Sequence, residues 1–118
     1  MARRILVIDD DPAFREVLIQ RLRQREYDVY GASTGREGLD RLLDEKFDLL
    51  LLDLIMPPPT GLDILRALPL IDEPPICIIV SGVGDAWAER QSEFKPLAVL
   101  QKPIDFPMLL AMIESAFR

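Results

Sequence analysis

The sequence contains no histidine and only one cysteine, Cys77, among its 118 residues. The absence of histidine excludes Ser-His-Asp and Cys-His catalysis, histidine metal ligation, and a phosphohistidine formed on these residues. A single cysteine excludes a disulfide within the chain and favours a reducing, cytoplasmic compartment. Chemistry on this chain therefore depends on carboxylates, hydroxyls, lysines and backbone groups.

Long apolar runs are also missing. No segment approaches the roughly 18 apolar residues of a membrane span, and Met1 leads into a short strand-like run without a signal peptide. Basic residues are outnumbered, 14 to 20, which leaves a net charge of −6 and argues against nonspecific binding to nucleic acid or anionic lipid. Because 49% of the residues are apolar, we expect one folded cytoplasmic domain over residues 1–118.

Five short apolar runs alternate with segments of helical periodicity. The runs predict strands at residues 5–8, 28–32, 49–52, 76–80 and 97–100. Strands separated by helices require right-handed crossovers, which place the strands parallel in one sheet. Five strands are too few for an eight-stranded barrel. The predicted fold class is therefore α/β, a (βα)5 doubly wound parallel five-stranded sheet with the strand order 2-1-3-4-5.

Caps mark the starts of the first two helices. One starts at Pro12 after the N-cap Asp11, and the next starts at a capping box made by Thr34 and Glu37. The apolar faces predicted for these helices consist of Phe14, Val17, Leu18 and Leu22, and of Leu39, Leu42, Leu43 and Phe47. Further helices are predicted at residues 61–68, 85–94 and 107–117. Three prolines at residues 57–59 predict an extended, stiff loop before the third helix.

Polar side chains follow four of the predicted strands where each strand ends. Asp9 and Asp10 follow the first strand, Asp53 the third, Ser81 the fourth and Lys102 the fifth. In a doubly wound sheet, ligands bind outside the carboxyl ends of the strands, where the strand order reverses. We therefore expect the three carboxylates to converge on one pocket, with the hydroxyl and the ammonium on its other side.

Three neighbouring carboxylates repel one another and need a compensating cation. Without histidine or thiolate ligands, Mg²⁺ suits this set better than zinc or copper. A hydroxyl and an ammonium that face the ion could hold phosphoryl oxygens. One aspartate after a strand is most often a helix cap, and a lone Ser-Gly or Lys-Pro pair is most often a turn. Their joint occurrence at successive strand ends indicates a site for Mg²⁺ and a phosphoryl group.

With these motifs the chain resembles the response-regulator receiver domain of two-component signalling, which has a CheY-like and flavodoxin-like fold. The resemblance covers the whole length and rests on residues 5–12, 53–57, Gly61, 81–82 and 100–103. Each stretch is a weak signal alone, but their order and spacing are specific to receivers. The resemblance implies a phosphoacceptor signalling domain rather than an enzyme, although such a domain assists its own phosphotransfer and dephosphorylation.

The resemblance implies a role for each aspartate of the site. Asp53 would be the phosphoacceptor, a nucleophilic carboxylate that becomes an aspartyl phosphate. Mg²⁺ would be held by Asp10 directly and by Asp9 largely through water. Asp53 and the backbone carbonyl of Ile55 would complete the protein ligands.

The resemblance also implies a switch and its partners. Ser81 and Lys102 would hold the phosphoryl oxygens, and the peptide bond before Pro103 would be cis. Both side chains would move toward phosphorylated Asp53 and reshape the face made by the fourth helix, the fifth strand and the fifth helix. The phosphodonor would be a sensor histidine kinase or a phosphotransfer protein. The output would be a downstream partner, a homodimer, or an effector domain outside these residues.

Three positions depart from the family pattern or vary within it. Val99 stands where receivers commonly carry an aromatic residue, so we do not expect an aromatic rotamer switch. Ile55 and Val83 are apolar at two variable positions that would flank the path of the hydrolytic water. We expect them to obstruct that water and to slow loss of the phosphoryl group.

The last helix has a wider apolar face than one packed side requires. The residues of this face are Met108, Leu109, Leu110, Met112, Ile113, Ala116 and Phe117. One flank either pairs with a second copy through the fourth and fifth helices, packs on a domain outside these residues, or stays partly exposed.

Three other functions stay open. An Asp-nucleophile, Mg²⁺-dependent phosphohydrolase would use similar groups, but its nucleophile follows the first strand in an Asp-x-Asp-x-Thr pattern. This chain has Asp9-Asp10-Asp11-Pro12 there. A flavodoxin-like cofactor carrier would need a Ser/Thr/Gly-rich phosphate loop after the first strand. An interaction module that works without phosphorylation is disfavoured because all five site residues are present.

Overall fold

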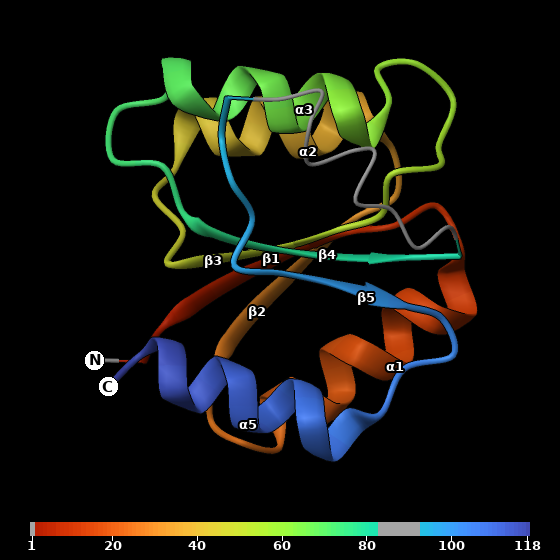
Figure 1. Cartoon of the computed structure of the whole chain (residues 1–118), viewed down its shortest axis with the longest axis vertical. Helices are drawn as coiled ribbons and strands as arrows, with labels where there is room; N and C mark the ends of the chain where they lie inside the picture. The colour runs from red at the N-terminus through yellow and green to blue at the C-terminus, as the bar shows by residue number, and fades with distance from the viewer. Residues whose placement is uncertain (1, 83–92) are drawn as a thin grey trace.

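One parallel sheet forms the centre of the molecule (Figure 1). The computed structural model describes residues 2–82 and 93–118. The strands are β1 (Arg4–Ile8), β2 (Asp28–Ala32), β3 (Leu49–Leu52), β4 (Ile76–Ser81) and β5 (Ala98–Gln101). Their order in the sheet is β2-β1-β3-β4-β5, so the predicted fold class and strand order are confirmed.

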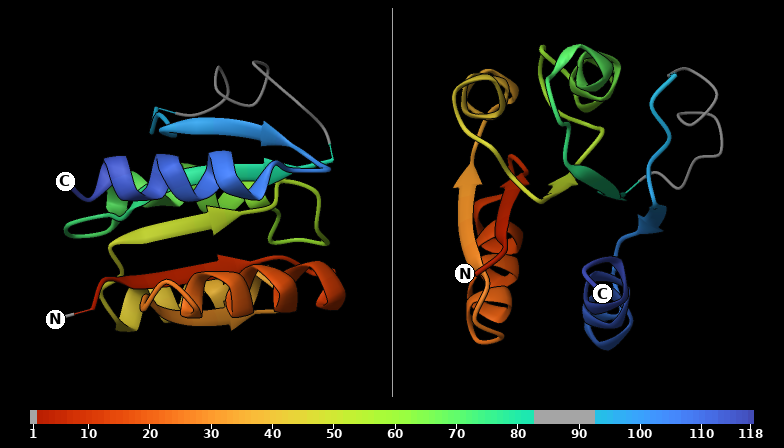
Figure 2. Two further views of the ribbon diagram at one scale, coloured as in Figure 1. Left: turned by 90° about the horizontal axis from the view of Figure 1, so that it is seen from below. Right: turned by 90° about the vertical axis from the view of Figure 1, so that its left-hand side faces the viewer.

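Helices cover both faces of the sheet. The pair α2 (Gly35–Asp44) and α3 (Gly61–Ala67) lies on one face, and α1 (Pro12–Arg23) and α5 (Phe106–Ala116) lie on the other (Figures 1 and 2). The predicted helix at 85–94 falls largely on residues 83–92, outside the described residues, and stays a prediction. Within the described part of the chain, no helix has the length and apolarity that crossing a membrane requires.

The inner residues of the strands are mostly apolar because each side of the sheet faces a separate core. In β1, Leu6 and Ile8 belong to the cluster that includes residues of α2 and α3, whereas Ile5 and Val7 belong to the cluster that includes residues of α1 and α5. Successive side chains of a strand point to opposite faces. An unbroken apolar run is therefore what a sheet covered on both faces requires.

Two residues assigned to the apolar faces of the first two helices are in fact exposed, so that part of the prediction is wrong. Val17 of α1 is 43% exposed and Leu43 of α2 is 65% exposed. The buried residues of α1 are Leu18, Ile19 and Leu22, so the face turned to the sheet lies away from Val17. Local periodicity detects an apolar stripe, but contact with the sheet decides where its centre lies.

Several element boundaries differ by one residue from those predicted. The strand β4 extends through Ser81, which places this residue in the sheet rather than in a turn, and β5 starts and ends one residue later. Asp105 caps the last helix, which begins one residue early at Phe106. A 3₁₀ turn, Leu68–Leu70, contains Pro69 and continues the chain directly from α3.

The caps of α2 and α3 also differ from the prediction. Thr34 accepts a hydrogen bond from the Glu37 N–H at 3.1 Å, which is one half of the predicted capping box. A complete capping box occurs at the start of α3, where Thr60 and Asp63 each bond to the backbone N–H of the other.

The loop between β3 and α3 is bent, so the prediction of an extended proline loop is wrong. Residues 56–59 form successive bends, and the Pro58–Pro59 peptide bond is cis. The loop folds against the start of α2, where a Cβ atom on Gly35 would overlap the Pro59 carbonyl oxygen. This packing joins separate segments of the chain, and proline stiffness alone does not encode it.

Candidate functional site

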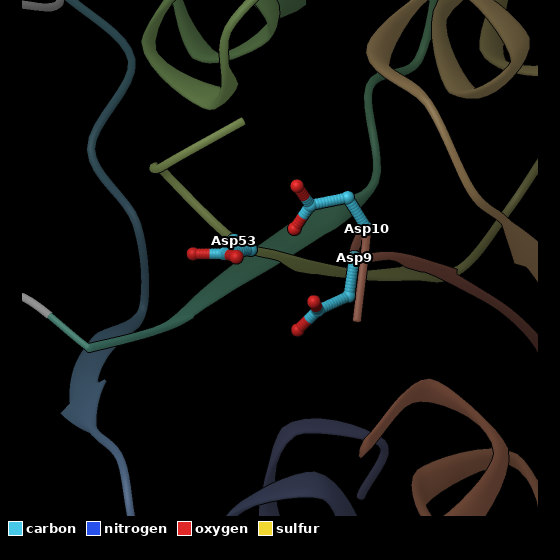
Figure 3. A group of neighbouring side chains, drawn as sticks. All are labelled: Asp9, Asp10 and Asp53. Carbon is cyan, nitrogen blue, oxygen red and sulfur yellow. The ribbon is translucent and has the colours of Figure 1, made fainter. Parts of the chain in front are cut away.

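The carboxyl ends of β1 and β3 bring three aspartates together. Asp9 follows β1 and its N–H donates to the Ala32 carbonyl at 3.2 Å, whereas Asp53 follows β3 and donates to the Ile8 carbonyl at 3.0 Å. Asp10 lies beside them. One carboxylate oxygen from each aspartate lies within 4.8 Å of the other two, and Figure 3 shows the three side chains gathered at the strand ends. Parallel pairing of the strands thus produces the convergence expected from the sequence.

The three carboxylates differ in exposure. Asp9 and Asp53 are 2% and 6% exposed, whereas Asp10 is open to solvent. The Oδ1 atom of Asp9 accepts a hydrogen bond from the Asp11 N–H at 2.9 Å, and the Asp11 side chain in turn caps α1. The site is therefore a pocket with two buried carboxylates and a third at its opening.

Lys102 brings a positive charge to the buried carboxylates. Its Nζ atom lies 2.9 Å from Asp9 Oδ2, 3.7 Å from Asp53 Oδ2 and 4.3 Å from the centre of the Phe14 ring. Burial lowers the pKa of the Lys102 ammonium, but the hydrogen bond to Asp9 and the nearby carboxylates outweigh it and raise this pKa above its ordinary value. Lys102 is therefore a charged donor within the pocket.

Burial raises the pKa of the Asp53 carboxyl above its ordinary value. The Ile55 N–H opposes this shift by donating to Asp53 Oδ1 at 3.2 Å. The negative charge of Asp9 raises the pKa of Asp53 further, whereas Lys102 and the Ser81 hydroxyl lower it. The net rise means that the pocket, as built by these residues, holds ionised Asp53 at an energetic cost.

The ends of β4 and β5 supply the hydroxyl and the ammonium. Ser81 is the last residue of β4 and is fully buried. Its carbonyl accepts a hydrogen bond from the Lys102 N–H at 2.8 Å, and its hydroxyl bonds to Asp53. The Lys102–Pro103 peptide bond is cis, the isomer that the resemblance implies. The two residues therefore reach the pocket from adjacent strands.

The other predicted positions lie at the rim of the pocket or outside it. Ile55 follows Asp53 by two residues and is 61% exposed. Val99 is half-buried in β5 opposite Ile79 and packs against the cluster that includes α2 and α3. Val83 lies outside the described residues, so its place at the site stays a prediction.

Two residues acquire roles that sequence reasoning missed. Helical periodicity predicts Phe14 only as part of the apolar face of the first helix, yet its ring also contacts the Lys102 ammonium. In the sequence, only its spacing from Asp53 distinguishes Gly61. The structure explains why a glycine stands there, because a Cβ atom at this position would overlap the Asp53 carbonyl oxygen. The contact of Phe14 with Lys102 has no local sequence signal because the two residues lie far apart in the sequence, whereas Gly61 is marked only by its spacing from Asp53.

The donor atoms of the pocket fit a hard divalent cation. Among the described residues, the three carboxylates of the cluster outnumber the one ammonium that pairs with them, so this group of side chains carries an excess of negative charge when ionised. Carboxylate oxygens are the ligands that Mg²⁺ and Ca²⁺ prefer, whereas zinc favours histidine and thiolate. The sequence has no histidine, and Cys77 is buried within β4. The residues present therefore fit Mg²⁺.

Comparison with known proteins agrees with the resemblance to receiver domains. The family model for the response regulator receiver domain matches residues 5–114. A CheY-like receiver domain protein from Methanospirillum hungatei JF-1 is 31% identical, with a TM-score of 0.89 over 98% of this chain and 93% of its own. A response regulator receiver protein from Pseudomonas putida is also 31% identical, with a TM-score of 0.87 over 98% of each chain.

A third similar structure contains bound groups. It is a response regulator protein from Burkholderia pseudomallei with a phosphorylated aspartic acid, a calcium ion and citrate. It is 26% identical, with a TM-score of 0.83 over 93% of this chain and 65% of its own. The family match extends over most of the sequence, and the similar structures share the fold described above. The chain therefore belongs to the response regulator receiver domain family, the CheY-like signalling domains of two-component systems.

Proposed function

We propose that residues 1–118 form one receiver domain that accepts a phosphoryl group on Asp53 from a histidine kinase or a phosphotransfer protein. The observation that supports this most is the place of Asp53, which is buried beside the acidic pair and Lys102 at the strand ends. The Burkholderia pseudomallei protein carries a phosphorylated aspartic acid. The phosphohistidine of the donor has to lie outside this sequence, which contains no histidine.

In the proposed transfer, an Asp53 carboxylate oxygen attacks the phosphorus atom. A new O–P bond forms while the P–N bond of the donor phosphohistidine breaks, and the electron pair of that bond stays on the imidazole nitrogen. The Oδ1 atom of Asp53 accepts a hydrogen bond from the Ile55 N–H at 3.2 Å, which orients the carboxylate. Positioning and charge neutralisation supply most of the rate in such transfers, and both depend on the side chains around Asp53.

Asp9, Asp10, Asp53 and the backbone carbonyl of Ile55 are the groups that would hold Mg²⁺. When bound, the ion would neutralise the repulsion among the carboxylates and the charge on the transferred phosphoryl oxygens. Both oxygens of Asp9 already accept hydrogen bonds, which favours a contact through water. Asp10 is exposed and suits direct ligation.

Ser81 and Lys102 are placed to respond to phosphorylation. They lie at adjacent strand ends joined by a backbone hydrogen bond of 2.8 Å. A phosphoryl group on Asp53 adds about two negative charges at neutral pH and competes with Asp9 for the ammonium. The proposed output is a shift of the ends of β4 and β5 that alters the face made by β5, α5 and the predicted fourth helix. With Val99 on β5, this switch works without an aromatic rotamer.

Incubation with Mg²⁺ and acetyl phosphate tests the phosphoacceptor role. Intact mass should show one added phosphate on the wild-type chain and none on Asp53→Asn. Asp40→Asn removes an exposed carboxylate on α2 and should be labelled like the wild type. A label that persists in Asp53→Asn would overturn the proposal. Continuous turnover of a phosphomonoester would support the Asp-nucleophile phosphohydrolase instead.

Ile55 and Val83 are proposed to lengthen the lifetime of the aspartyl phosphate. Ile55 is exposed beside Asp53, where its side chain offers a hydrolytic water no hydrogen bond. The double variant Ile55→Asn with Val83→Glu should lose phosphate faster than the parent protein after the donor is removed. Equal rates of phosphate loss would contradict this role.

The flank formed by β5 and α5, together with the predicted fourth helix, is the proposed contact for a second copy of the chain. A surface hollow of about 340 Å³ lies there, lined by Leu97, Ala98, Met112, Ser115 and Ala116. An exposed apolar surface of this kind favours a protein contact. Sedimentation with and without a phosphoryl mimic tests this. A dimer supports the proposal, and a monomer in both states leaves an effector domain outside these residues as the proposed partner.

A further inference from the structure

The aromatic ring of Phe14 faces the ammonium of Lys102. The Nζ atom lies 4.3 Å from the ring centroid, well inside the roughly 6 Å over which a cation–π attraction acts. Phe14 is in the first turn of α1, is half-buried, and packs against the cluster that includes residues of α1 and α5. The core therefore supports the ring while the ring contacts the ammonium.

A continuous series of contacts leads from Lys102 through Asp9 and Asp11 to Phe14 and back to Lys102. Lys102 Nζ donates to Asp9 Oδ2 at 2.9 Å. Asp9 Oδ1 accepts from the Asp11 N–H at 2.9 Å, and Asp11 Oδ1 accepts from the Phe14 N–H at 3.3 Å. The Phe14 ring in turn contacts the Lys102 ammonium. The segment that carries the acidic pair thus also places the ring.

The ring supplies an attraction that the carboxylates do not. Asp9 Oδ2 is 2.9 Å from the ammonium and Asp53 Oδ2 is 3.7 Å from it, so the ammonium is attracted to two separate carboxylates. A π face attracts the ammonium without taking a proton from it and replaces part of its water. Because lysine has a flexible four-carbon stem, a third contact restricts the conformations that its side chain samples.

We propose that Phe14 is a positioning residue for Lys102, whose ammonium it holds between Asp9 and Asp53 through a cation–π contact. The consequence for phosphorylation rests on the proposed function of Asp53, whereas the contact itself does not. A leucine at position 14 fills much of the same core space but has no π face. The lysine then turns more freely to solvent, and more of its ordering has to occur when the phosphoryl group arrives.

Proton NMR of the Lys102 side chain tests the contact itself. Protons held over an aromatic face resonate upfield, so the Lys102 Cε protons should lie upfield of those of Lys46, which pairs with Glu73. Phe14→Leu should remove this upfield shift, and Phe14→Tyr should keep it. Lys102 resonances that do not change in Phe14→Leu would overturn the inference.

The rate at which acetyl phosphate labels Asp53 tests the consequence. Phe14→Leu should slow labelling by about two- to tenfold, the range expected for a partly exposed cation–π contact, and Phe14→Tyr should restore the rate. In a Lys102→Met background, Phe14→Leu should cause no further loss, because the ring acts through the ammonium. An equal loss in both backgrounds would show that the ring acts through the fold and would overturn the inference.

Phe106→Leu is the matched control. Phe106 is half-buried against the same cluster, and its ring centroid lies 4.8 Å from the guanidinium carbon of Arg21, in a cation–π contact that involves no residue of the pocket. This variant should lose stability as Phe14→Leu does, but it should keep the labelling rate and the Lys102 resonances. If Phe14→Leu does not fold, Phe14→Met provides the same aliphatic comparison.

The two tests separate the inference from the proposed function. A wild-type chain that gains no phosphate counts against the phosphoacceptor proposal, and the NMR comparison still decides the role of Phe14. Normal labelling of Asp53 without an upfield shift of Lys102 overturns the role of Phe14 alone.

Discussion

Asp53 is a residue that stability alone would not select. Its carboxyl is 6% exposed, and burial together with the neighbouring Asp9 raises its pKa, so the ionised form costs free energy. The Ile55 N–H and the Lys102 ammonium offset only part of this cost. A perturbed carboxyl at the ends of parallel strands indicates a position held for chemistry.

Asp53→Asn should therefore stabilise the metal-free protein by a few degrees at neutral pH. The pKa of Asp53 in the folded state lies above the ordinary value of 3.8. The folded state thus binds the proton of the Asp53 carboxyl more tightly than the unfolded state does. The wild type therefore loses stability as the pH rises from the pKa of the unfolded state to the raised pKa of the folded state. Thermal unfolding in EDTA should show the largest difference in melting temperature between Asp53→Asn and the wild type at pH 7. This difference should become smaller in acid. A variant less stable than the wild type at pH 7 would contradict this.

Gly61 is required by space rather than by backbone conformation. Its φ is not positive, but a Cβ atom would overlap the Asp53 carbonyl oxygen and Leu54 Cα. Gly61→Ala should lower the free energy of unfolding by about 1–3 kcal/mol and slow the labelling of Asp53, whose backbone has to shift. Among the described residues, nothing lies within 4 Å of a Cβ on Gly82. Gly82→Ala should therefore leave the urea midpoint unchanged, and the same midpoint for both variants would argue against the overlap.

At the scale of elements, side-chain caps locate the helix starts more accurately than periodicity does. The helices α1, α2, α3 and α5 each begin with a capping Asp or Thr, namely Asp11, Thr34, Thr60 and Asp105. The box at Thr60 is harder to detect in the sequence because Asp63 stands three residues after the cap, where the usual pattern has Glu or Gln. This cap matters for the pocket, since α3 begins with the glycine that packs on Asp53.

Thr60→Ala should lower the free energy of unfolding by about 1 kcal/mol, the usual cost of losing a Thr cap. The variant loses the hydroxyl that accepts from the Asp63 N–H at 3.1 Å. Thr60→Ser keeps an equivalent oxygen and should recover most of the loss. Urea unfolding measures both. If the alanine and serine variants were equally stable, the cap would contribute nothing to α3.

At the scale of the whole molecule, charge is arranged in two different ways. Pairs such as Arg4–Glu45 and Arg41–Glu45 lie on partly exposed surface, where ion pairs contribute little to stability. At one edge of the sheet, by contrast, three carboxylates face the single ammonium of Lys102. This edge is therefore where an added cation should stabilise the fold most.

Mg²⁺ should raise the melting temperature, because the proposed site exists in the folded pocket and not in the unfolded chain. A free concentration 100 times the dissociation constant would add about 2.7 kcal/mol to the free energy of unfolding. Asp10→Asn should remove most of this gain while changing the metal-free stability little, since Asp10 is exposed. A titration of Mg²⁺ followed by thermal unfolding and reversed with EDTA measures the gain. An undiminished gain in Asp10→Asn would place the ion elsewhere.

The sequence by itself determined the sheet and the residue types at its edge. Unbroken apolar runs such as the one around Leu6 predict strands buried on both faces, and the helices between them require parallel pairing. Once the strands are parallel, residues that follow them, such as Asp9, Asp53 and Lys102, have to meet at one edge. These conclusions need only local patterns and general rules of topology.

Only the tertiary structure decided how the meeting residues touch. The Phe14 ring contacts Lys102, Gly61 packs on the Asp53 carbonyl, and the proline loop bends against α2. It also decided that Val17 and Leu43 face solvent. The contacts of Phe14 and of the proline loop join elements that are separated along the chain. Their distances are set by sheet register and helix packing, which act after the local patterns have formed and leave no local signal in the sequence.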